Sequence, residues 1–101
     1  MISGIGLANA AKNGTANFTK IRYIVNGTAY IESANTTYTD LLPLKYKVTK
    51  NCVISGKTGV LTKAELLDPE YTVIMSKEIN VTLSAQADTF ISFDINYELS
   101  L

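Results

Sequence analysis

Hydrophobic and polar residues alternate strictly near the end of the chain, and this is the strongest pattern in the sequence. Between residues 91 and 101 each odd position is apolar and each even position is polar. A period of two is typical of a β-strand with one buried face. Residues 79–84 show the same alternation, so the two segments predict an antiparallel hairpin over residues 79–101. We expect the core face of its last strand to be formed by Ile91, Phe93, Ile95, Tyr97 and Leu99.

The positions of the apolar residues in the two strands of this predicted hairpin constrain the length of its loop. Pairing Leu83 with Thr89 puts the apolar positions of both strands on one face, whereas pairing Leu83 with Phe90 splits them between two faces. We therefore expect a loop of odd length or a bulge near Phe90. An unbroken last strand over residues 89–101 would be about 40 Å long at about 3.3 Å per residue, which is long for a small domain. Its end is therefore expected to pair with, or pack on, another chain.

A second hairpin is predicted around Asn26-Gly27. The segments on either side, residues 21–25 and 28–32, are rich in β-branched and aromatic residues. Asn-Gly tolerates the two positive φ angles of a type I′ turn, so a two-residue loop is expected. This loop pairs Val25 with Thr28, Tyr23 with Tyr30 and Ile21 with Glu32.

The remaining segments predict shorter elements. Residues 34–40 are polar and predict a loop or an edge strand, and residues 1–16 predict a short helix or an extended arm. Further strands are expected over residues 44–49, 52–54 and 71–75. Thr62 and Glu65 have the spacing of a capping box, which predicts a helix of one or two turns near residues 62–67. The whole pattern predicts an all-β or β-rich single domain over residues 1–101, a small antiparallel β-sandwich or barrel with at most these short helices.

Composition narrows the class of protein. Hydrophobic residues make up 47% of the chain, charged residues 18%, and the formal net charge is zero. This composition indicates a folded domain rather than a disordered one, and it gives no basic surface for nucleic acid. No apolar run approaches the roughly 18 residues of a membrane-spanning helix, and no signal peptide is recognised. A chain with few charges and no net charge is poorly soluble as a monomer, which favours an assembly subunit.

The residue types needed for catalysis are scarce. The chain has no histidine and one cysteine, Cys52, which we expect to be a small buried hydrophobic residue. No cluster of metal-binding residues occurs in the sequence, so no metal, cofactor or enzymatic activity is expected. Asp68 and Glu70 flank a proline and indicate a turn, while Gly56-Lys57-Thr58 lacks the earlier glycine of a phosphate-binding loop. Two charged groups predict solvated strand faces: Asp94 with Glu98, and Lys45 with Lys47 and Lys50.

Asparagine sequons leave a second class of function open. The motif Asn-X-Ser/Thr occurs at Asn13, Asn17, Asn26, Asn35 and Asn80. In a secreted eukaryotic or archaeal protein these asparagines would accept glycans. Abundant Asn and Thr would also produce such motifs by composition alone.

One segment resembles a known family. Residues 6–14 read Gly-Leu-Ala-Asn-Ala-Ala-Lys-Asn-Gly and are followed by Phe18-Thr19-Lys20-Ile21. This segment, about the first quarter of the chain, resembles the start of the N-terminal attachment domains of phage tail fibres, which open with a small-residue helix and a Phe-Thr-Lys-hydrophobic strand. The Gly-Asp-Gly turn usual in that family is replaced by Val25-Asn26-Gly27, and its later Glu-hydrophobic-Gly signature is missing. The resemblance implies a phage virion structural protein.

The sequence therefore favours a structural virion subunit: a tail, baseplate, head-fibre or capsid-decoration protein. Such a subunit would assemble in the host cytoplasm by binding itself and another virion protein, with no nucleic acid and no membrane as partner. The alternative is a secreted, extracellular β-sandwich of a fibre or adhesion subunit, with or without glycans. We expect the N-terminal arm and the end of the last strand to make subunit contacts. The candidate interface residues are Ile5, Leu7, Tyr97, Leu99 and Leu101.

Overall fold

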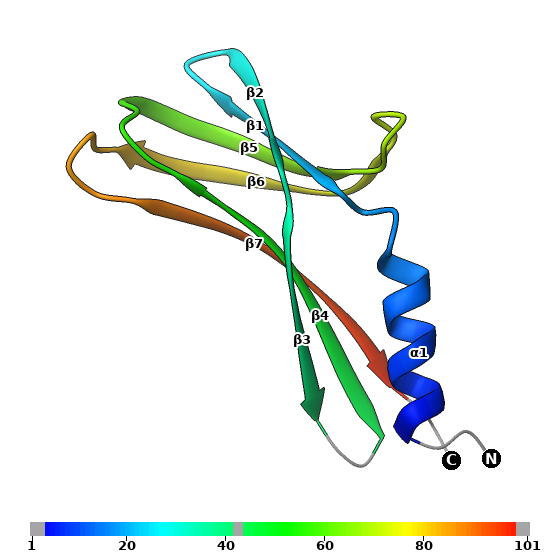
Figure 1. Ribbon diagram of the computed structural model, residues 1–101. Helices are drawn as coiled ribbons and strands as arrows, with labels where there is room; N and C mark the ends of the chain where they lie inside the picture. Colours follow the sequence, from blue (N-terminus) through cyan, green and yellow to red (C-terminus); the bar gives the residue numbers. More distant parts are fainter. Residues whose placement is uncertain (1–3, 42–43, 99–101) are drawn as a thin grey trace.

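The computed structural model describes residues 4–41 and 44–98 and shows two antiparallel sheets packed together with one helix beside them (Figure 1). The four-stranded sheet, here called sheet A, has the order β2-β1-β5-β6, and the three-stranded sheet B has the order β3-β4-β7. The elements are α1 (Gly4–Thr15), β1 (Lys20–Val25), β2 (Thr28–Ser33), β3 (Asn35–Leu41), β4 (Lys45–Ile54), β5 (Gly59–Leu67), β6 (Val73–Leu83) and β7 (Thr89–Glu98). The predicted fold class, a small β-rich sandwich with a short N-terminal helix, is confirmed.

The hairpin around Asn26-Gly27 forms as its sequence predicts. Strands β1 and β2 pair in the expected register, with Val25 opposite Thr28 and Tyr23 opposite Tyr30. Asn26 has a φ of 49° and Gly27 a φ of 79°, as a type I′ turn requires. The rings of Tyr23 and Tyr30 stack with their centroids 5.5 Å apart, which adds a cross-strand aromatic contact to the pairing.

Strand β2 continues almost directly into β3, which belongs to the other sheet. Only Ala34 separates the two strands, and its N–H donates to the carbonyl of Thr19. Of the two structures predicted for residues 34–40, a loop or an edge strand, the fold contains the edge strand β3, which pairs with β4. Figure 1 shows this long ribbon running from the top of the picture down through its middle.

The predicted hairpin over residues 79–101 is wrong. Strand β6 pairs with β5 in sheet A, and β7 pairs with β4 in sheet B, so residues 84–88 cross from one sheet to the other. Leu83 and Ile91 still share one core, because they face each other across the two sheets instead of lying side by side in one sheet. The constraint on the turn near Phe90 therefore does not apply.

The helix predicted near residues 62–67 is also wrong, because these residues belong to β5. Ala64 and Leu66 face the core opposite Tyr23 and Ile21 of β1. Glu65, between them, points to the outer face of the sheet. The capping-box motif requires only a spacing of three residues, and here that spacing falls within a strand.

The other strands match the sequence with shifted bounds. Residues 44–49 and 52–54, predicted as two strands, form the single strand β4, and its even positions are buried as the alternation predicts. The strand predicted from Tyr71 begins at Val73 and continues to Leu83. Asp68 and Glu70 lie in the preceding turn, where a carboxylate oxygen of Asp68 accepts hydrogen bonds from the N–H groups of Glu70 and Thr72.

One face of sheet B is covered by two different elements along its length. Sheet A covers the half that carries Cys52 and Phe93, and α1 covers the half that carries Tyr46 and Val48. This arrangement produces two clusters of buried side chains, one between the sheets and one under the helix. The inter-sheet cluster comprises Ile21, Tyr23, Val25, Cys52, Ile54, Leu61, Ala64, Leu66, Leu83, Ile91 and Phe93.

Helix α1 packs closely on sheet B because small residues of the helix face the sheet. Ala11 of α1 is fully buried against the sheet, and Gly14 lies so near Tyr97 that an added Cβ would come within 2.5 Å of the phenol oxygen. The buried Thr15 hydroxyl donates to the carbonyl of Ala11, which ties down the last turn of the helix. The run of small residues therefore acts as a close-packing surface for the sheet.

Candidate functional site: the open edges of sheet A

Among the strands of residues 4–41 and 44–98, the two outer strands of sheet A, β2 and β6, each have one edge without a neighbouring strand. A free edge presents unpaired backbone groups on which another strand can add. Both strands are exposed over most of their length, in contrast to the central strands β1 and β5. The exposed large apolar residues on these edges are Tyr30 and Ile31 of β2, and Val73, Ile74 and Val81 of β6.

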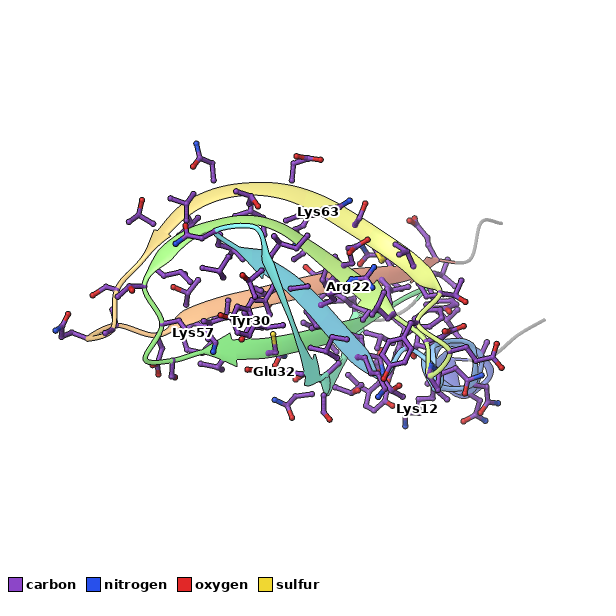
Figure 2. All side chains as sticks on the ribbon, turned by 90° about the horizontal axis from the view of Figure 1, so that it is seen from above. Lys12, Arg22, Tyr30, Glu32, Lys57 and Lys63 are labelled. Carbon is purple, nitrogen blue, oxygen red and sulfur yellow. The ribbon has the colours of Figure 1, made fainter. Side chains whose placement is uncertain are left out.

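The β2 edge carries an acid on the face that looks toward sheet B. Glu32 accepts a hydrogen bond of 2.9 Å from the hydroxyl of Tyr23, and this bond together with burial raises the pKa of that phenol. Beside Glu32 on the same face, the ammonium of Lys57 lies 4.1 Å from the centre of the Tyr30 ring. Figure 2 shows Tyr30, Glu32 and Lys57 near one another, away from Lys12 on the helix.

The β6 edge carries a base on the corresponding face. Lys77 pairs with Ala64 of β5, so its side chain points toward sheet B. Its ammonium donates to the carbonyl of Ser92 and lies 4.6 Å from the centre of the Phe93 ring. An inward-pointing charge on an edge strand discourages pairing with unsuitable strands.

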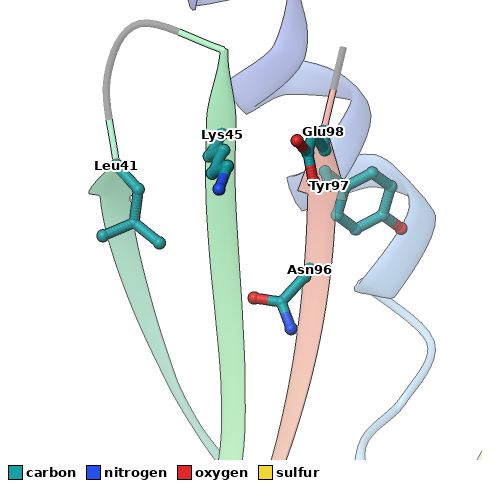
Figure 3. A pocket seen from close by; sticks show the side chains of 5 residues that line it. All are labelled: Leu41, Lys45, Asn96, Tyr97 and Glu98. Atoms are coloured by element: carbon teal, nitrogen blue, oxygen red, sulfur yellow. The ribbon is translucent and has the colours of Figure 1, made fainter. Parts of the chain in front are cut away.

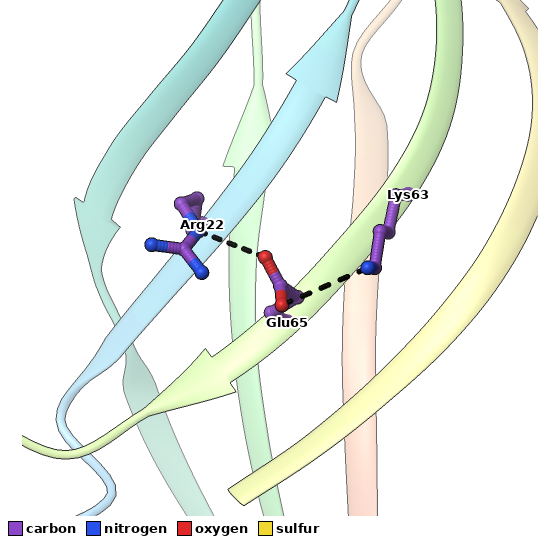
Figure 4. A network of polar contacts seen from close by, with 3 residues as sticks. All are labelled: Arg22, Lys63 and Glu65. Atoms are coloured by element: carbon purple, nitrogen blue, oxygen red, sulfur yellow. Dashed lines mark hydrogen bonds and ion pairs between the residues drawn. The ribbon is translucent and has the colours of Figure 1, made fainter. Parts of the chain in front are cut away.

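The outer face of sheet A is held by a small ion network (Figure 4). The guanidinium of Arg22 lies 2.8 Å from a carboxylate oxygen of Glu65, and Lys63 lies 3.9 Å from the other oxygen. Glu65 is only 7% exposed, and the hydrogen bond from Arg22 is the main cause that lowers the pKa of its carboxyl. The network links β1 to β5, the two central strands of sheet A.

The lowered pKa of Glu65 predicts an acid-sensitive contribution to stability. The folded state holds this proton less tightly than the unfolded chain, so the contribution is present above the ordinary glutamate pKa and is lost as pH falls through the folded-state pKa. Glu65→Gln should lower the free energy of unfolding by about 1–2 kcal/mol at pH 7, and this difference should shrink below about pH 4. Urea unfolding at several pH values measures it. Glu78→Gln, at an exposed position opposite Lys63, is the control, and an equal loss there would contradict the assignment.

One surface hollow lies at the far end of sheet B (Figure 3). Its volume is about 280 Å³, and it is lined by Leu41, Lys45, Asn96, Tyr97 and Glu98. Lys45 and Glu98 are opposite each other on β4 and β7, and their charges compensate. Asp94, on the same outer face, is exposed and accepts a hydrogen bond from Thr49, so the solvated face predicted for the acids of β7 is what the structure contains.

Of the five residues predicted as a subunit interface, the structure describes the side chains of Leu7 and Tyr97. Leu7 lies on the buried face of α1, and Tyr97 packs against the same cluster within one chain, so their role in subunit contacts stays a prediction. In Figure 3 the Tyr97 ring lies toward the helix. The side chain of Ile5 and the whole of Leu99 and Leu101 lie outside the described residues. The open edges of sheet A were not predicted from the sequence, because residues 79–84 were expected to pair with the last strand of the chain.

The prediction that Lys50 lies on a solvated strand face is wrong. It was grouped with Lys45 and Lys47 as solvated charge, but it is 3% exposed and faces the core side of β4. Its ammonium donates a 2.8 Å hydrogen bond to the hydroxyl of Thr36, and burial lowers its pKa. Within residues 4–41 and 44–98, no carboxylate forms a salt bridge with it. Its even position on the strand was the signal that could have placed it inside.

Chemistry elsewhere in the described chain is limited. Cys52 is buried, as predicted, and burial is the main cause that raises the pKa of its thiol to about 11. Within the part of the chain that the structure describes, no three metal-binding side chains lie together. Over the same part, no helix has the length and apolar character needed to cross a membrane.

Comparisons of the chain with models of protein families, with curated proteins and with solved structures each gave no match.

Proposed function

We propose that this chain is a structural subunit of a phage virion, in a tail, baseplate, head fibre or capsid decoration, which assembles with copies of itself and binds a neighbouring virion protein. The observation that carries the proposal is the pair of open, partly apolar edges on sheet A. Burial of apolar side chains and strand pairing between subunits are common routes to assembly. The resemblance of the first quarter of the chain to phage attachment domains supports the virion setting.

Self-association is the first test of this proposal. Light scattering coupled to size-exclusion chromatography should show oligomers whose mass rises with protein concentration, since edge pairing between copies follows mass action. Electron microscopy with an antibody against the chain should then label assembled particles. A monomer at all concentrations, with no labelled particles, would count against the proposal.

A secreted fibre or adhesion subunit remains the second candidate, because all five sequon asparagines are exposed. Asn26 is the least suited to a glycan, since its amide oxygen accepts a 2.9 Å hydrogen bond from the N–H of Val60. Intact-mass measurement of protein from its native source separates the two candidates. Glycan mass on the chain would favour the secreted subunit, and an unmodified mass would favour the virion subunit.

A further inference from the structure

We propose that copies of this chain join head to tail through sheet A, with β6 of one copy pairing antiparallel with β2 of the next. This inference rests on the proposed function, because it specifies how the subunit would bind itself. It assigns the binding surface to two edges at opposite sides of one sheet. Each copy then offers one edge of each kind, so the contact can repeat.

The direction of the strands favours this joint. Sheet A has four strands that are all antiparallel to their neighbours, so its outer strands β2 and β6 run in opposite directions. Placing β6 beside β2 of a second copy therefore continues the antiparallel pattern. Sheet B has three strands, and its outer strands β3 and β7 run in the same direction. Joining copies head to tail there would require a parallel pair, which is less stable per residue.

The backbone of β2 is oriented for such an addition. In a two-residue hairpin the residues that flank the turn form a hydrogen-bonded pair, and such pairs recur at every second position. Ala29, Ile31 and Ser33 therefore turn their backbone N–H and C=O groups away from β1 and toward the open edge. This row can accept a partner strand without breaking any pair within the hairpin.

Charge complementarity selects one register. Glu32 of β2 and Lys77 of β6 both point toward sheet B, so they would lie on the same face of a continuous sheet. Placing Lys77 opposite Glu32 of the next copy also puts Ile79 opposite Tyr30 and Ser76 opposite Ser33. Each position then faces a residue on the same side of the sheet, as antiparallel pairing demands. Both charged groups have capacity for this contact, since a carboxylate accepts several hydrogen bonds and an ammonium donates three.

Lys77 also disfavours the competing joint of β6 with β6. A two-fold pairing centred on Lys77 would place two lysines opposite each other, and one centred on Glu78 would place two glutamates opposite each other. Like charges directly opposite are destabilising in a sheet. The same inward charge that blocks unsuitable strands therefore favours an edge that supplies Glu32.

Cysteine pairs test this arrangement directly. Ser33 and Ser76 are exposed, and opposite residues of an antiparallel pair lie at Cα distances that a disulfide spans, about 4.5–5.5 Å. Ser33→Cys protein mixed with Ser76→Cys protein should form a disulfide-linked dimer under mild oxidation, and this dimer should be lost when either variant is oxidised alone. The native Cys52 is buried and has a raised thiol pKa, so it gives little background reaction.

The register and the charge pair have their own controls. Asn80→Cys, an exposed residue four positions further along β6, should not cross-link with Ser33→Cys. Adding Lys77→Glu to the Ser76→Cys chain should reduce its cross-linking severalfold, and adding Glu32→Lys to the Ser33→Cys chain should restore it. Far-UV circular dichroism of each variant checks that the fold is retained.

The other outcomes would overturn the inference in distinguishable ways. Rapid dimer formation by one cysteine variant alone would indicate a two-fold joint of β2 or β6 with itself. Oligomers in light scattering without mixed cross-links would mean that the subunit assembles through other surfaces, so the proposed function would stand and this joint would fall. A strict monomer would contradict both proposals.

Discussion

Phe93→Ala should lower the free energy of unfolding by about 3–5 kcal/mol, the largest effect expected from a single truncation in this chain. Phe93 lies on β7, belongs to the inter-sheet cluster and is 2% exposed. Its ring also lies 4.6 Å from the ammonium of Lys77, so truncation removes an edge contact together with core volume. A cavity at this position weakens the contact between the sheets themselves.

Phe90→Ala is the matched control for this experiment. Phe90 is the same residue type on the same strand, but it lies on the opposite face and is 70% exposed. Its truncation should change the free energy of unfolding by no more than about 0.5 kcal/mol. Urea unfolding of both variants, monitored by circular dichroism, gives the comparison. Similar losses in the two variants would mean that sheet A does not cover this face of β7.

The contrast between Phe93 and Phe90 also indicates what the sequence could reveal. Alternation fixed which side of β7 is buried, since the odd residues Ile91 and Phe93 face the core and the even residues Asp94 and Asn96 do not. The Asn26-Gly27 hairpin was predictable to the residue, because its turn chemistry and its strands lie within one short segment. In both cases the signal is local, and no distant part of the chain was needed to interpret it.

The pairing of the strands with one another could not be predicted in the same way. Two amphipathic strands joined by a short loop have the same sequence pattern whether they lie beside each other in one sheet or face each other across two sheets. Leu83 and Ile91 meet in the core in the second way, with β5 and β4 as their actual neighbours. The choice depends on strands that are distant in sequence, such as the pairing of Cys52 with Ile91. Periodicity within a segment carries no information about that choice.

The wrong hairpin also hid the candidate site. Residues 79–84 were expected to be covered by the last strand, so the sequence did not predict an open edge there, and the interface was predicted at the two ends of the chain instead. Glu32 and Lys77 are unremarkable in the sequence, and their relation depends on two strands at opposite sides of sheet A. Composition could not indicate which surface is open.

Lys50→Met should raise the free energy of unfolding by about 1–3 kcal/mol at pH 7. Lys50 is nearly inaccessible, and in the described part of the chain its ammonium has the Thr36 hydroxyl but no carboxylate as partner. The cost of removing this charge from water is therefore only partly offset. Methionine has a similar length and shape and no charge, so it keeps the packing and removes the desolvation cost. Lys47→Met, three positions earlier on the outward side of β4, should change stability by less than about 0.5 kcal/mol.

The pH dependence of the stability difference between the natural protein and Lys50→Met tests whether the buried charge is its cause. Burial lowers the pKa of Lys50, so the folded state holds this proton less tightly than the unfolded chain does. The stability of the natural protein relative to Lys50→Met should therefore rise with pH between the lowered pKa and the ordinary lysine value of 10.5. Cys52 and Tyr23 have raised pKa values and act in the opposite direction above about pH 9, but they are present in both proteins and cancel in the difference. If Lys50→Met were less stable than the natural protein at every pH, the ammonium would have to be stabilised by a charge partner, and its burial would be favourable.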